Sequence, residues 1–336
     1  MTETTNQKGF FPTEVIFALT DACNLHCAHC FVPRKARHLK TQDAVDFIEE
    51  CAKNIAPDGL SFINKVGFSG GEPFLDLNFL CKVTETSVKN GMIFDRIMTN
   101  AVWWKDKNEL FSALQKIYDC GFDGKIGISF DNFHGQSAEK IADFINVAEE
   151  IWQNPEIIEI QSVIDTRLPL KEDSEHLHRL ANILNADFYE ETKKDGSGEM
   201  AIENDEVFVR IFRFLPSLPS ENPAAWKSKK WFKEDFCKGP GNIFYVHPDG
   251  NIAPCCGFAN ENSAIFIGTI KSPFAQLLEN AKNNRLVKIC FEQGLSSLIP
   301  QAEKKLKESG IFSGRETPRT ENICTFCDYA AKKLCN

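Results

Sequence analysis

The chain has 336 residues, of which 43% are hydrophobic, and a formal net charge of -9 at pH 7. This acidic balance argues against nucleic acid as the main partner. No apolar run is long enough to span a membrane, and residues 1–9 lack the apolar core of a signal peptide. We therefore expect a cytoplasmic protein, in which thirteen cysteines indicate metal thiolates rather than disulfides.

Apolar segments alternate with amphipathic segments from about residue 13 to about residue 215. The apolar runs predict strands and the amphipathic runs predict helices with one buried face, which together favour an α/β fold with a parallel sheet. We expect a first domain over residues 13–215 and a second over 216–336. Strands are predicted at 15–19, 65–69, 94–98, 125–130, 157–164 and 207–214, and helices at 43–54, 77–89, 108–120, 139–153 and 172–184.

Three cysteines follow the first predicted strand with the spacing C-x3-C-x2-C. Three thiolates are one fewer than the four that close an ordinary iron-sulfur or zinc site, so a cluster held here would keep one iron open for a substrate or cofactor. The alternatives are a zinc knuckle that takes its fourth ligand from His26 or His29, or three unrelated core cysteines. The candidate ligands are Cys23, Cys27 and Cys30.

Glycine-rich or polar segments end the next three predicted strands. Gly70-Gly71-Glu72-Pro73 follows the second strand, Thr99-Asn100 ends the third, and Ser129-Phe130-Asp131 ends the fourth. Two glycines allow the backbone to approach a ligand closely, and the carboxylate of Glu72 can accept a hydrogen bond from an ammonium group. Because ligand sites gather at the carboxyl ends of parallel strands, we expect these segments and the three cysteines to share one edge of the sheet.

The pattern changes near residue 216. Two apolar stretches flank Pro248-Asp249-Gly250-Asn251, which predicts a β-hairpin with a tight turn at the glycine. One cysteine precedes this hairpin, another ends it, and a C-x2-C pair lies near the C-terminus, so that four thiolates can close a 4Fe-4S site or a zinc ribbon. Cys335 is either a spare thiol or a substitute ligand. The four candidate ligands are Cys237, Cys255, Cys324 and Cys327.

The order of these segments resembles the radical S-adenosylmethionine (radical SAM) superfamily, which has the same cysteine spacing followed by a GGEP segment. The resemblance implies a partial (β/α)6 barrel and a 4Fe-4S cluster on the three N-terminal cysteines that cleaves SAM reductively to a 5'-deoxyadenosyl radical. The spacing Cys237-x12-Gly250-x4-Cys255 is similar to that of SPASM and twitch domains, which implies one auxiliary 4Fe-4S cluster in a small hairpin-plus-helix domain. The radical SAM resemblance also implies which residues contact SAM. These are His29, Gly70, Gly71, Glu72, Pro73, Thr99, Asn100, Ser129 and Asp131.

Four segments carry a closer resemblance: Gly70-Gly71-Glu72-Pro73-Phe74-Leu75-Asp76, the loop 129–134, Pro254-Cys255-Cys256 and the terminal stretch 323–327. Together, and loosely over residues 15–327, they resemble the radical SAM peptide epimerases of epipeptide biosynthesis. The resemblance implies a ribosomally made peptide as substrate, a reductant such as flavodoxin or ferredoxin, and conversion of an L-residue to a D-residue, with Cys256 returning a hydrogen atom to Cα. The first hairpin strand departs from that pattern, because Asn242 and Ile243 stand where an acidic residue assisting the donor thiol is expected.

The fate of the product radical separates the remaining hypotheses. Return of a hydrogen atom from Cys256 gives epimerisation, whereas loss of an electron to the auxiliary cluster gives dehydrogenation or a thioether or carbon-carbon cross-link. Cys256 is otherwise a packed hairpin cysteine with no chemical role. A non-catalytic iron-sulfur or zinc protein is the third hypothesis, and any cleavage of SAM would exclude it.

Overall fold

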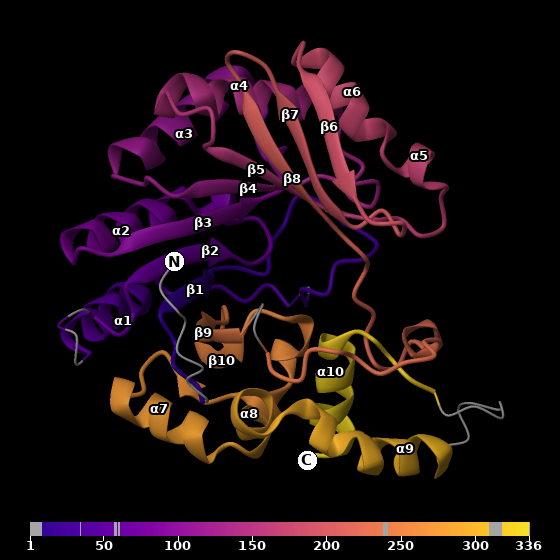
Figure 1. Ribbon diagram of the computed structural model, residues 1–336. Coiled ribbons are helices and arrows are strands. Elements are labelled where there is room, and N and C mark those ends of the chain that lie inside the picture. The colour runs from indigo at the N-terminus through magenta and orange to yellow at the C-terminus, as the bar shows by residue number, and fades with distance from the viewer. Residues whose placement is uncertain are drawn as a thin grey trace.

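The computed structural model describes residues 9–33, 35–56, 59, 61–237, 241–308 and 318–335. Residues 1–8, where we expect no signal peptide, lie outside the described residues. Within the described residues, eleven strands form one sheet in the order β11-β10-β9-β1-β2-β3-β4-β5-β8-β7-β6 (Figure 1). The sheet is curved, and its inner side faces the C-terminal part of the chain.

The middle of the sheet is parallel and confirms the six predicted strands. Helices lie along the outer side of its curve (Figure 1), so strand residues on that side are buried and rich in Phe, Ile and Val. The strands are β1 (Glu14–Ala18), β2 (Lys65–Ser69), β3 (Ile93–Thr99), β4 (Lys125–Ser129), β5 (Ile158–Val163) and β8 (Phe208–Phe214). The covering helices are α1 (Thr41–Lys53), α2 (Leu77–Lys89), α3 (Lys107–Asp119) and α4 (Ala138–Trp152).

Local sequence explains where these helices begin and which face they bury. The Asp76, Asp106 and Ser137 side chains accept hydrogen bonds from the first-turn amides of α2, α3 and α4, respectively, which satisfies amides that have no partner within the helix. Each helix carries one apolar stripe, as in α3, where Leu110 and Leu114 are fully buried. No helix in the described part of the chain is long and apolar enough to cross a membrane.

The region after β5 differs from the prediction in two ways. The predicted helix at 172–184 is interrupted at Ser174, which separates α5 (Leu170–Asp173) from α6 (Glu175–Ile183). An antiparallel pair that the sequence analysis does not anticipate, β6 (Asp187–Thr192) and β7 (Gly198–Glu203), then extends the sheet beyond β8. The side chains of β6 are all exposed or half-buried, so this strand has no apolar face that a hydrophobic pattern would reveal.

The C-terminal part joins the other side of the sheet. The predicted hairpin is present as β9 (Gly241–Val246) and β10 (Asn251–Cys255), and β9 lies parallel to β1 with Ile243 opposite Glu14. The division into two domains stays a prediction. A two-residue strand, β11 (Gly268–Thr269), follows. In Figure 1, α7 (Phe274–Asn283), α8 (Arg285–Lys288) and α9 (Ile299–Glu308) lie below the hairpin, and α10 (Ile323–Lys333) stands beside it.

Candidate active site

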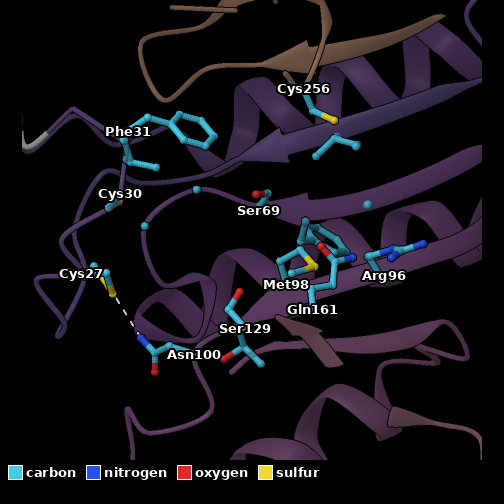
Figure 2. Close-up of a pocket in the computed structure, with 18 of the residues that line it drawn as sticks. Cys27, Cys30, Phe31, Ser69, Arg96, Met98, Asn100, Ser129, Gln161 and Cys256 are labelled. Atoms are coloured by element: carbon cyan, nitrogen blue, oxygen red, sulfur yellow. Dashed lines mark hydrogen bonds between the residues drawn. The ribbon is translucent and has the colours of Figure 1, made fainter. Parts of the chain in front are cut away.

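A cavity of about 630 Å³ lies on the inner side of the curved sheet. Its wall is formed by the cysteine loop, by residues of the parallel strands and the loops after them, and by the β9–β10 hairpin (Figure 2). Glu72 and Pro73 are not part of the wall. The predicted site residues that line it are Cys23, Cys27, His29, Cys30, Gly70, Gly71, Thr99, Asn100, Ser129, Asp131 and Cys256.

The two glycines after β2 hold the loop that carries the cysteines. The Gly71 amide donates to the Thr20 carbonyl at 2.6 Å, and the Glu72 amide donates to the Ala22 carbonyl at 2.8 Å. A Cβ atom on Gly71 would lie 2.1 Å from the Ala22 oxygen, so no other residue fits here without moving the loop. The close approach that Gly-Gly permits is therefore, in this structure, an approach to the chain's own backbone just before Cys23.

The three cysteines of this loop suit a cluster with an open iron. Cys23 Sγ accepts hydrogen bonds from the Leu25 amide at 3.4 Å and from Asn100 Nδ2 at 3.6 Å, while Cys30 is exposed. In Figure 2, Cys27 and Cys30 lie at one end of the cavity. Of the two histidines that could complete a zinc knuckle, His29 lines the cavity and His26 does not. Three sulfur donors at the rim of a cavity fit a 4Fe-4S cluster whose fourth iron faces a bound cofactor.

Glu72 is fully buried and organises the end of β3. Its carboxylate accepts hydrogen bonds from Thr99 Oγ1 at 2.8 Å, the Asn100 amide at 2.7 Å and the Phe74 amide at 3.1 Å. Burial raises its pKa to about 7, although these hydrogen bonds oppose the shift. With three of its acceptor positions used, Glu72 fixes the cavity residues Thr99 and Asn100. The expected contact between Glu72 and an ammonium group stays a prediction.

Asp131, His134 and His29 form a polar group at the end of β4. Asp131 Oδ1 lies 2.7 Å from His134 Nδ1, and its other oxygen accepts from the Val163 amide at 3.1 Å. Burial alone would raise the pKa of Asp131, but the His134 interaction and the backbone donor hold it below its ordinary value. The His29 ring packs against Phe133, with ring centroids 4.7 Å apart, and its buried Nδ1 has no hydrogen-bond partner among the described residues. A flat, partly covered imidazole of this kind can stack on another aromatic ring.

Cys256 enters the cavity from the hairpin. In Figure 2 the Cys256 side chain points from the hairpin into the cavity. Ser69, Met98 and Gln161 lie on the opposite side, along the parallel strands. Burial, and after it the negative charge of Glu14, raise the pKa of Cys256 to about 12, so the group is a protonated thiol near neutral pH. The cavity therefore has the cysteine loop at one end and an S–H bond in its wall.

A second, smaller cavity lies below the hairpin and is lined by cysteines. It brings together the four predicted ligands Cys237, Cys255, Cys324 and Cys327, and adds Cys290, which the sequence analysis does not identify. Cys290 Sγ lies 3.7 Å from Cys327 Sγ, and the Cys290 carbonyl accepts from the Cys237 amide at 3.0 Å. Cys290 follows Ile289 and precedes Phe291 in a buried helical turn, so its local sequence is that of a core residue. Cys335 does not line this cavity.

The donor set of the second cavity fits a metal centre. Burial and the neighbouring thiols raise the pKa of Cys237 and Cys255 above the ordinary value for a thiol. No cationic side chain among the described residues lines this cavity. Thiolates packed together in such surroundings require a bound metal to be stable, because the metal supplies the missing positive charge.

Comparison with known proteins adds a family and a fold. Over residues 14–142 the chain matches the family described as a 4Fe-4S single cluster domain. It is 22% identical to YydG of Bacillus subtilis (strain 168), a protein named for peptide biosynthesis, over 315 residues that cover 92% of this chain and 89% of YydG. It is 23% identical to the GTP 3',8-cyclase of Clostridium botulinum (strain Hall) over 290 residues, covering 80% of this chain and 89% of the cyclase.

The fold is shared with a solved structure of anSMEcpe with bound AdoMet and Cp18Cys peptide. The TM-score is 0.54 at 15% sequence identity, and the alignment covers 96% of this chain and 98% of that chain. This similarity confirms the predicted fold class. The cysteine motif and the matched family agree on a 4Fe-4S cluster as cofactor. The chain is thus similar to a 4Fe-4S single cluster domain over residues 14–142, and in fold it is similar to a protein solved with bound AdoMet.

Proposed function

We propose that this enzyme epimerises a residue of a ribosomally made peptide, from L to D at Cα, with Cys256 as the hydrogen-atom donor. The observation that carries the proposal is the protonated Cys256 thiol in the wall of the same cavity that the cysteine loop closes at one end. A peptide held between the two would present its two faces to different groups. The peptide-biosynthesis name of YydG and the peptide bound to anSMEcpe support a peptide substrate.

The residues that hold the cofactors follow from the two cavities. Cys23, Cys27 and Cys30 are the proposed ligands of the SAM-binding 4Fe-4S cluster, which supplies the electron that splits SAM into methionine and a 5'-deoxyadenosyl radical. The proposed SAM contacts are those predicted from the sequence, with Glu72 acting through Thr99 and Asn100 and Pro73 starting the short helix behind them. The proposed ligands of an auxiliary 4Fe-4S cluster of the twitch or SPASM type are Cys237, Cys255, Cys324 and Cys327.

The chain itself must fix one C–H bond and exclude competing donors. Ile16, Met98, Val163 and Ile243 give the cavity apolar wall, which limits water near a reactive radical. Gln161 and Ser129 add hydrogen-bonding groups suited to a peptide backbone. Cys256 then offers the S–H hydrogen from the side of the hairpin. A hydrogen removed on one face and returned on the other inverts Cα.

Oxidation of the peptide is the second candidate function. It is favoured by the closed thiol site next to Cys256, because an auxiliary cluster bound there lies close enough to the cavity to accept an electron. The product would then be a dehydrogenated or cross-linked peptide that is lighter by two hydrogen atoms, and Cys256 would be dispensable.

Mass spectrometry of a reaction in D2O separates the two functions. Anaerobically reconstituted enzyme, reductant, SAM and candidate peptides encoded beside the gene are incubated with wild type, Cys256→Ala and the control Cys120→Ala, a half-buried cysteine outside both cavities. For wild type and the control we expect 5'-deoxyadenosine and a gain of one mass unit per altered residue. Cys256→Ala should still form 5'-deoxyadenosine but not the D-residue. A loss of two mass units in all three proteins would reject epimerisation.

A further inference from the structure

The sheet continues beyond the active-site cavity through β8, β7 and β6 (Figure 1). Phe214 of β8 lines the cavity, and the alternate residues Phe212 and Arg210 point to the same side of the sheet. Strand register carries this side across the next two strands, since Phe212 is opposite Glu199 and Glu199 is opposite Glu191. We call this side of β8, β7 and β6 the inner face. It begins at the cavity wall.

Helix α6 covers the opposite side of these strands and leaves the inner face open. Phe188 of β6 packs against His178 of α6, with ring centroids 4.2 Å apart, and Met200 of β7 is buried. On the inner face, by contrast, Tyr189 and Phe214 keep 53% and 47% of their surface exposed. Exposed aromatic side chains on a surface that adjoins a substrate cavity are suited to packing against a peptide.

The inner face carries acidic pairs that cost stability. Asp187 is opposite Glu203, and Glu191 is opposite Glu199, in the antiparallel pair of β6 and β7. Like charges directly opposite each other on neighbouring strands are destabilising. None of these four carboxylates has an ion-pair partner within the part of the chain that the structure describes, and Arg210 is the only cationic strand residue there on this face. The face is therefore complementary to a positively charged ligand.

We propose that the inner face of β8, β7 and β6 binds the segment of the peptide substrate next to the altered residue, and that this segment is extended and basic. The inference rests on the proposed peptide substrate. It adds the enzyme surface that holds the peptide outside the cavity and the chemistry that this surface selects. It does not depend on which reaction occurs at Cα.

Strand spacing sets how far the basic residue lies from the altered residue. Gln161, which lines the cavity, is opposite Phe212 in the parallel pair of β5 and β8. Glu191 is three strands away from Gln161, roughly 14 Å at about 4.8 Å per strand. An extended peptide covers this distance in about four residues. Because the altered residue lies further inside the cavity, we expect a Lys or Arg about four to eight residues from it.

The test uses two neighbouring glutamates of β6 that point to opposite sides of the sheet. Glu191→Lys reverses a charge on the inner face, and Glu190→Lys is the control, because Glu190 is opposite the buried Met200 and so lies on the other side. A fluorescently labelled copy of the peptide that wild type alters is titrated with each enzyme and read by anisotropy. We expect Glu191→Lys to weaken binding about fivefold and to raise KM equally at unchanged kcat, and Glu190→Lys to match wild type.

A charge exchange tests whether the contact is direct. In a second peptide, the basic residue about four to eight positions from the altered residue is replaced by Glu. We expect this peptide to bind Glu191→Lys at least threefold more tightly than it binds wild type. Tyr189→Ser removes an exposed aromatic side chain without changing the charge, and it should weaken binding of the natural peptide about threefold. This variant also serves if Glu191→Lys fails to fold.

The proposal is wrong if Glu191→Lys and Glu190→Lys bind the natural peptide equally well, if the charge exchange gives no recovery, or if no candidate peptide binds wild type. A wild type that elutes as a dimer in size-exclusion chromatography, with Glu191→Lys as a monomer, would instead assign the inner face to a second copy of the chain. Failure of the epimerase proposal has a different signature, because wild type would then release a product lighter by two hydrogens while the differences in binding remain.

Discussion

The two cysteine sites of this enzyme are built in opposite ways. Cys23, Cys27 and Cys30 are half-buried or exposed on a loop at the rim of a large cavity, and hydrogen bonds from the Gly-Gly segment fix the backbone that leads into that loop. The second cavity is lined by five thiols, which come from the hairpin, α10 and two further segments. Three of these five cysteines are buried. A site that must bind and release a cofactor needs an open position, whereas a site that is closed by protein ligands does not. If both groups bind clusters as proposed, the difference teaches that access to the site separates their tasks.

The largest loss of activity is expected from a substitution that disturbs the backbone contact between Gly71 and the loop of Cys23, Cys27 and Cys30. In Gly71→Ala the new Cβ atom would meet the Ala22 carbonyl, so the cysteine loop must shift away from β2. We expect at least a tenfold loss of 5'-deoxyadenosine formation, together with loss of the iron bound at the loop. Iron analysis and electron paramagnetic resonance of the reduced protein check this. In Gly91→Ala the added Cβ meets no atom within 4 Å but sits at a φ of +69°, so this control should lose some stability through local backbone strain and still keep the iron bound at the loop.

The next prediction concerns the second cavity and asks which of its five thiols bind metal. Two thiolates on one tetrahedral ion stand about 3.8 Å apart, given metal-sulfur bonds of about 2.3 Å, whereas in a 4Fe-4S cluster each thiolate binds its own iron. The 3.7 Å between Cys290 and Cys327 is thus too short for both to bind one 4Fe-4S cluster in these positions. We expect Cys327→Ala to lose the auxiliary iron and Cys290→Ala to keep it, with a drop of about 1–2 kcal/mol in the free energy of unfolding. The reverse result would make Cys290 the ligand, and retention of one zinc per chain would indicate a zinc site.

The smallest effect is expected for a residue outside both cavities, and it is an effect on stability. It tests whether a buried carboxyl group is functional merely because it is buried. Burial, and then the charge of Glu206, raise the pKa of Glu149 in α4 to about 8. Because this value is above that of the unfolded chain, folding loses stability as the pH rises from about 4.5 through 8. We expect Glu149→Gln to raise the free energy of unfolding by about 1 kcal/mol at pH 9 and to leave it unchanged at pH 4, as measured by urea denaturation. Turnover at pH 7.5 should not change, because Glu149 does not line the active-site cavity.

Much of the barrel could be predicted because its signals are local. The six parallel strands are short apolar runs, and α2 begins and ends where the pattern places it, since the Asp76 cap and the apolar spacing both lie within the segment. Strand β6 escapes prediction because its side chains are exposed or half-buried, and β7 buries only Met200 and Ile202, which is too short an alternation to stand out. Cys290 escapes for the opposite reason, since its neighbours Ile289 and Phe291 are apolar and give it the local sequence of a core residue.

The sequence by itself determined the chemistry. The C-x3-C-x2-C spacing, the glycine pair and the polar strand ends predict thiolate ligands and a cofactor site, and the structure brings these segments to one cavity. Cysteine spacing along a loop is a property of the local chain. Only the tertiary structure decided which groups meet across the cavity. Glu14 and Ile243 are far apart in the sequence, yet β1 and β9 pair them, and the same pairing brings Cys256 over the barrel. Strand pairing between distant segments depends on how the whole sheet closes, and no local pattern encodes it.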